Sequence, residues 1–158
     1  LDTDLEILIP DNYVSNVEER FNLYKELNNF LSEKEITIFS KSLEDRFGKL
    51  PKAVCYLFDA LRLRWIGKEV GFRRIILKSD YMKAFFIEDK NSFYFETPQF
   101  LKVLEYCKTN FQTTKIKEKN GKLSVIVEDI STIKEAIDFC KNFSLNNLSL
   151  LSPNFKCN

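Results

Sequence analysis

The sequence contains no histidine, the side chain that most often serves proteins as a general base and as a zinc ligand. Only four of its 158 residues are glycine, and neither G-x-x-x-x-G-K followed by Ser or Thr nor G-x-G-x-x-G occurs, which argues against a phosphate cradle. Neighbouring acids such as Glu44-Asp45 diverge on a helix or strand and do not converge on a substrate. We therefore expect no catalytic residues, no metal and no cofactor in this segment.

Charge and hydropathy also exclude partners. The net charge is only +1, from 24 basic and 23 acidic residues, which argues against steering of the whole molecule to nucleic acid. No apolar run approaches the ~20 residues of a membrane span, and we expect no membrane partner. The four cysteines never form a C-x-x-C pair, and Cys55, Cys107 and Cys140 fall on apolar positions of expected helices. These observations favour reduced cysteines and a cytoplasmic setting.

Helical periodicity dominates the first half of the chain. A first helix is expected to start at a capping box over Ser15–Glu18, and a second at a capping box over Ser32–Glu35, with Leu31 packed on Ile36 as a hydrophobic staple. A third helix is expected from Pro51 to about Val70. The apolar stripes predicted for the first two helices are Val17, Phe21, Tyr24, Leu27 and Leu31, and then Ile36, Phe39, Leu43 and Phe47.

The second half changes to short apolar and aromatic runs that are typical of strands. Three strands are expected at 72–78, 82–87 and 92–96, and a hairpin follows around Asn120-Gly121, a strong two-residue turn signal. Two further helices are expected, one opening at Thr97-Pro98 and one capped by Ser131.

These elements predict an α+β fold. An N-terminal three-helix segment is followed by antiparallel strands with two further helices around one shared core. We expect a single domain over residues 1–146, with a helical part at 14–71 and a strand-rich part at 72–146, and a polar tail at 147–158. Because the chain does not begin with methionine, we expect it to be a piece of a longer protein.

The stretch from Leu43 to Pro51 is where the second helix meets the third. Gly48 suits the left-handed end of a helix, and Pro51 suits a first helical turn. An acid at a helix C-terminus such as Asp45 is disfavoured, and Ser42, Asp45 and Arg46 share one face at spacings i, i+3 and i+4. Either Asp45 is satisfied locally, by Lys41 or by N–H groups of the next helix, or Asp45 and Arg46 form a partner-binding charge pair.

A second candidate is basic. Arg62, Arg64, Lys68, Arg73 and Arg74 cluster across the end of the third helix and the following strand. This set is either a phosphate-contacting stripe, which would make the chain a nucleic-acid-binding module, or an ordinary salt-bridged surface. No RNP-like aromatic motif or helix-turn-helix pattern accompanies it.

Three runs carry a family resemblance. The runs Ile9-Pro10-Asp11-Asn12-Tyr13-Val14, Arg20-Phe21-Asn22-Leu23-Tyr24-Lys25 and Glu44-Asp45-Arg46-Phe47-Gly48-Lys49-Leu50-Pro51, with Leu57, Leu61 and Arg62 downstream, resemble the C-terminal domain of the bacterial transcription-repair coupling factor. The likeness is specific from about Leu5 to Ile75. It implies a DNA translocase that uses ATP, removes stalled RNA polymerase and recruits the excision-repair protein UvrA, with this piece lying after the motor.

The resemblance also implies a role for the joint. In that family this domain packs on an N-terminal module similar to UvrB and covers its UvrA-binding surface, which holds the protein in a repressed state. The interdomain contact corresponds here to Asp45 and Arg46. An acid often found three positions before that aspartate is Ser42 in this sequence, which removes one charge from the contact. Phe47, Gly48, Leu50 and Pro51 match as residues that set the shape.

Overall fold

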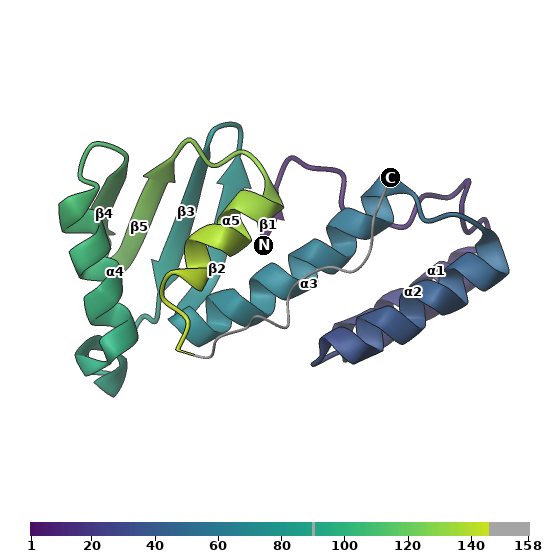
Figure 1. Cartoon of the computed structure of the whole chain (residues 1–158), viewed down its shortest axis with the longest axis horizontal. Coiled ribbons are helices and arrows are strands. Elements are labelled where there is room, and N and C mark those ends of the chain that lie inside the picture. Colours follow the sequence, from purple (N-terminus) through teal and green to yellow (C-terminus); the bar gives the residue numbers. More distant parts are fainter. Residues whose placement is uncertain (90, 146–158) are drawn as a thin grey trace. The chain divides into compact units, whose positions relative to one another are not determined.

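A computed structural model describes residues 1–89 and 91–145, and these form two compact units. Of the described residues, 1–5 and those from 62 to 145 form one unit, called here the sheet unit, and 6–61 form the other, the helical unit. The fold is α+β, with three N-terminal helices followed by a mixed five-stranded sheet and two further helices, as predicted (Figure 1). The predicted single domain over residues 1–146 stays a prediction, and the predicted tail at 147–158 lies outside the described residues.

The helical unit contains α1 (Val17–Asn28), α2 (Glu33–Phe47) and the first ten residues of α3 (Lys52–Val70). The predicted stripe of α2 is confirmed, since Ile36, Phe39 and Leu43 are buried. The ring of Phe39 lies 5.2 Å from that of Phe30 and 6.2 Å from that of Phe58 on α3, both edge-on, a favoured arrangement of aromatic pairs. This aromatic row is the centre of the unit's core.

The predicted face of α1 is confirmed at Leu27 and at the half-buried Tyr24 but is wrong at its other positions. Val17 and Phe21 are 71% and 59% exposed, and the buried residues are Leu23 and Leu27. The N-cap is Asn16, whose Oδ1 accepts from the Glu19 N–H at 2.9 Å, instead of the predicted Ser15.

The predicted hydrophobic staple before α2 does not form. Leu31 is exposed, while Ile36 is fully buried. Half of the capping box is present, because Glu35 accepts hydrogen bonds from the Leu31 N–H and the Ser32 hydroxyl.

The sheet unit is built on β1 (Asp2–Thr3), β2 (Phe72–Lys78), β3 (Tyr81–Phe86), β4 (Thr114–Lys119) and β5 (Lys122–Glu128). The strand order is β1-β2-β3-β5-β4, with β1 parallel to β2 and the other pairs antiparallel. The predicted hairpin is confirmed. Asn120 and Gly121 join β4 to β5 with φ of 52° and 74°, the left-handed values that this tight turn requires.

Helices α4 (Pro98–Thr109) and α5 (Ile133–Lys141) and the end of α3 pack on one face of this sheet. Phe86 of β3 meets Phe100 of α4 at 5.4 Å, and Gly67 of α3 lies against Ile75 of β2. Tyr106 of α4 contacts two rings of the α5 region. The cap of α5 is Thr132, one residue after the predicted Ser131, in a complete capping box with Glu135.

The strand predicted at 92–96 is wrong. Residues Phe93–Glu96 form a short 3-10 helix, η1, because Ser92 accepts the Tyr94 N–H and the chain turns locally. The Tyr94 hydroxyl then donates to the Val70 carbonyl at 2.6 Å, which fixes η1 to the end of α3. Tertiary packing outweighs the strand propensity of the aromatic run.

The cysteines divide into two groups. Cys107 and Cys140 are buried and free, as expected, and burial raises the pKa of the Cys107 thiol and raises that of Cys140 to about 12. Cys55 is also buried but is disulfide-bonded, so the expectation that it is reduced is wrong.

The tightest glycine generates a stability prediction. Gly71 has φ of +100°, and a Cβ there would lie 2.1 Å from the Tyr94 ring. Gly71→Ala should therefore lower the free energy of unfolding by more than ~2 kcal/mol, from backbone strain plus displacement of a packed ring. Gly67→Ala is the matched control, because its Cβ meets only the flexible end of Ile75 at 2.9 Å and helix propensity improves. Urea unfolding curves measure both; equal effects would contradict the packing argument.

The capping box of α5 predicts a pH dependence. The N–H groups of Ser131 and Thr132 hold the pKa of the Glu135 carboxyl below its usual 4.5. A carboxyl whose pKa is lower in the folded than in the unfolded state stabilises the fold fully at pH values above its unfolded-state pKa. This contribution is lost as the pH falls through its folded-state pKa. Glu135→Gln should therefore lower the urea midpoint at pH 7, with the difference shrinking below about pH 4.5. A pH-independent difference would contradict this, and Glu105→Gln, an exposed position within α4, is the control.

Candidate interdomain contact site

The joint between α2 and α3 is set by two backbone positions. Gly48 has φ of +86° and donates its N–H to the Glu44 carbonyl at 2.9 Å, which ends α2 as predicted. Pro51 lies one residue before α3, and its carbonyl accepts the N–H groups of Val54 and Cys55 at 3.0 and 3.2 Å. The short connection between the helices follows from these two residues.

Tyr13 fixes the C-terminal end of α2. Its hydroxyl donates to the carbonyl of Gly48, the C-cap residue of α2, at 2.8 Å and lies 3.2 Å from the Leu43 carbonyl of the same helix. Its ring lies 5.8 Å from that of Phe47. Burial, and then the nearby Glu44, raise the pKa of Tyr13, so the hydroxyl keeps its proton for donation.

The three predicted contact residues lie on the solvent-exposed side of α2. Ser42, Asp45 and Arg46 are all exposed. Arg46 Nη2 forms an ion pair with Oε1 of Glu19 on α1 at 2.6 Å, and its guanidinium lies 4.7 Å from the centre of the Phe47 ring. The pair is open to water, with Arg46 46% and Glu19 36% exposed.

Asp45 differs from Arg46 in having no such partner. Within the described residues it makes no ion pair or side-chain hydrogen bond, and neither Lys41 nor an N–H group at the start of α3 satisfies it. Both local explanations offered for this acid are therefore absent in that part of the chain. The carboxylate faces solvent at the negative end of the helix dipole, where it is disfavoured by ~0.3–1 kcal/mol.

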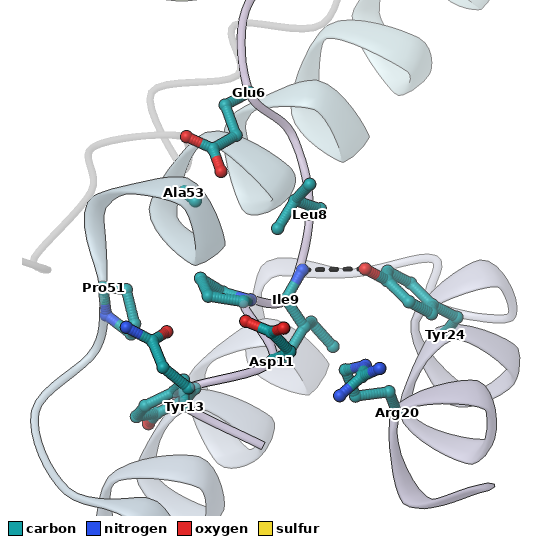
Figure 2. A pocket seen from close by; sticks show the side chains of 11 residues that line it. Glu6, Leu8, Ile9, Asp11, Tyr13, Arg20, Tyr24, Pro51 and Ala53 are labelled. Carbon is teal, nitrogen blue, oxygen red and sulfur yellow. Dashed lines mark hydrogen bonds between the residues drawn. The ribbon is translucent and has the colours of Figure 1, made fainter. Parts of the chain in front are cut away.

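A cavity of about 910 Å³ lies beside Tyr13. Figure 2 shows that the run from Ile9 to Tyr13 forms one wall and that α1 supplies Arg20 and Tyr24 opposite it. The Tyr24 hydroxyl accepts the Ile9 N–H at 2.7 Å, and Arg20 donates to the Val14 carbonyl at 2.6 Å. These bonds hold the irregular Ile9–Val14 segment in place, and so position Tyr13.

The predicted basic cluster is exposed except for one member. Arg62 is buried, whereas Arg64, Arg73 and Arg74 line a small cavity of about 50 Å³, and Lys68 is exposed one turn along α3 from Arg64. Its role in binding nucleic acid stays a prediction. Within the described residues, no three His, Cys, Asp or Glu side chains are placed to hold a metal ion, and no helix there is long and apolar enough to cross a bilayer.

Sequence reasoning missed two residues of this site. Tyr13 stands in a run quoted only for its family likeness, and a tyrosine carries no local signal for a helix end 30 residues away. Glu19 follows another acid, Glu18, and carries no local sign of a partner, since its pairing with Arg46 spans 27 residues.

Comparisons with known proteins show the family of the chain. The model of one protein family, described as the TRCF domain, matches residues 3–96 of this chain. The transcription-repair-coupling factor of Escherichia coli (strain K12) is 34% identical over 68 residues, which are 43% of this chain and 6% of that protein. The corresponding protein of Rickettsia prowazekii is 28% identical over 116 residues, covering 73% of this chain and 10% of that protein. The chain thus spans about a tenth or less of these relatives.

A solved structure shares the fold. It is described as the crystal structure of the C-terminal domain of transcription-repair coupling factor, with a TM-score of 0.63 and 18% identity over 90% of this chain and 89% of that one. Because the family model covers more than half of the sequence, the chain belongs to the TRCF domain family, that of the C-terminal domain of transcription-repair coupling factors.

Proposed function

We propose that this chain is a non-catalytic, autoinhibitory domain that docks on an N-terminal UvrB-like module of the same longer protein and masks its UvrA-binding surface. The longer protein is then an ATP-dependent DNA translocase of the cytoplasm that removes stalled RNA polymerase and recruits excision repair. Its contacts with UvrA, RNA polymerase and DNA reach this domain only indirectly. Membership of the TRCF domain family and the small share of its relatives that the chain spans support this assignment.

The observation that carries the proposal is the exposed Asp45. An acid placed at the unfavourable end of a helix, without a partner among the described residues, is readily explained by a cation that arrives with another domain. Tyr13 and Gly48 hold the helix end rigidly, so the carboxylate needs little further ordering when it binds.

Arg46 can change its partner from Glu19 to an acid of the docking module. Its exposed pair with Glu19 contributes at most about 1 kcal/mol, so a carboxylate on the partner can replace Glu19 at small cost. Adjacent opposite charges on one helix end select a partner with the complementary arrangement, and this gives register more than affinity. Such a contact is releasable because both charges regain water on separation.

Removal of the two charges should weaken docking. Asp45→Ala and Arg46→Ala should each lower the affinity for the separately produced N-terminal module by about tenfold or more, because truncation of one member of an interfacial charge pair leaves its partner unpaired. Titration calorimetry measures the affinity. Equal binding by the wild type and the double variant would remove this site.

Matched controls separate docking from folding. Glu44→Ala and Lys49→Ala remove neighbouring exposed charges and should leave the affinity unchanged. Glu19→Gln releases Arg46 from its internal partner and should leave docking unchanged or tighter. Weaker docking of Glu19→Gln would show instead that Arg46 acts only by tying α1 to α2.

Ser42 gives a prediction of opposite sign. Ser42→Glu places an acid one turn before Asp45, where the family often has one, and should tighten docking several-fold through an added charge contact. The gain should shrink as salt is raised from about 0.05 to 0.5 M, because exposed charges are screened. No gain at low salt would indicate that the partner surface near Ser42 lacks a cation.

A further inference from the structure

Within the described residues of the sheet unit, one face of the sheet carries no helix. Alternation along the strands divides the side chains: Ile75, Leu77, Met82, Ala84 and Phe86 are buried beneath the helices, and their neighbours point to the opposite side. Figure 1 shows α5 crossing one side of the strands, the side of α3 and α4. We call the opposite side the open face.

The strand registers arrange the open face in rows. One row runs across the sheet through Arg74, Phe85, Ser124 and Lys117. The next runs through Asp2, Ile76, Lys83, Ile126 and Lys115. A third contains Lys78, Tyr81 and Glu128.

These rows concentrate positive charge. They contain five basic side chains and two acidic ones, a surplus of three on a chain whose total is +1. Asp2 bridges Arg74 and Lys78 at 3.3 and 3.4 Å, and these cations, Lys78 first, hold the pKa of Asp2 low. Glu128 pairs with Lys115 at 2.8 Å. Lys83 and Lys117 make no ion pair with a described residue.

An aromatic ring lies in the middle of this charge. Phe85 is half-buried on the central strand, with the Lys83 ammonium 4.8 Å and the Arg74 guanidinium 5.8 Å from its ring centre. Tyr81, two residues before Lys83 on the same strand, is 39% exposed. A ring set among cations on an open sheet can stack one base while the cations contact the flanking phosphates.

We propose that the open face binds single-stranded DNA. A paired duplex cannot offer an unstacked base to Phe85, which favours a single strand. The hydroxyl of Ser124, the register partner of Phe85 on β5, is buried and already donates to the Lys117 carbonyl, so it is not free to donate to a ribose 2′-hydroxyl. The three spacings from β2 to β4 give a contact strip about 14 Å long. This site shares no residue with the docking contact, so the two proposals succeed or fail separately.

The test uses the full 158-residue chain and a fluorescent dT20 oligonucleotide, with anisotropy measured from about 0.05 to 0.3 M salt. Lys83→Gln with Lys117→Gln should lower the affinity about tenfold at low salt and reduce the salt slope by about 1.4, since each single-strand phosphate contact contributes about 0.7. Lys102→Gln with Lys108→Gln removes the same charge from exposed positions of α4 and should have little effect.

Two further variants separate stacking and charge. Phe85→Leu keeps the apolar volume and should lower the affinity about tenfold with an unchanged salt slope, because it removes only the stacked base. Asp2→Asn frees Arg74 and Lys78 and should raise the affinity, whereas Glu105→Gln, which adds the same charge on α4, should not. Because Asp2→Asn is expected to bind more tightly, its result still tests the proposal if the Lys83/Lys117 variant fails to fold.

Four results would overturn the proposal. No measurable binding at low salt is one, and equal losses for the Lys83/Lys117 and Lys102/Lys108 variants are another. The third is tighter binding of rU20 than of dT20. A loss confined to Arg64→Gln with Lys68→Gln would move the site to the basic cluster of α3 and likewise overturn it.

Discussion

The hydroxyl of Tyr13 provides the hydrogen bond on which the joint of the helical unit depends. The chain leaves α2 at Gly48, and there the phenol of Tyr13, 35 residues upstream, donates to the Gly48 carbonyl and lies 3.2 Å from the Leu43 carbonyl. That bond connects the irregular Ile9–Val14 segment to the end of α2, and the same segment is held from the other side by Arg20 and Tyr24. Because the helix end is fixed in this way, its exposed charges sit on a rigid support.

The features that sequence reasoning predicted correctly are those that a few adjacent residues determine. Gly48 ends α2 because only glycine readily adopts φ of +86°, and Asn120-Gly121 forms a hairpin turn for the same reason. The buried stripe of α2 was also predictable, since it has only one apolar side. In the candidate site, the exposure of Ser42, Asp45 and Arg46 followed from their spacing relative to that stripe.

The features that were missed depend on residues far apart in the sequence. Helix α1 carries two apolar stripes that share Leu27, and the choice of Leu23 over Phe21 is made by the packing partner. The aromatic run at 93–95 has the composition of a strand, yet the bond from Tyr94 to Val70 makes it a turn of helix. Arg62 has the charge of a surface residue and is buried. The alternation of side chains along each strand could not by itself have predicted the open face. Its rows of side chains depend on how five strands pair with one another, and the sequence does not give that register.

The lysines of β4 also bear on self-association. β4 lies at one edge of the sheet, where unpaired backbone groups would otherwise accept a strand from another molecule. Lys115, Lys117 and Lys119 occur at every second position of that strand, so a second copy pairing along it would bring like charges together. The composition of β4 thus protects the chain from edge-to-edge aggregation, whatever ligand its neighbours bind.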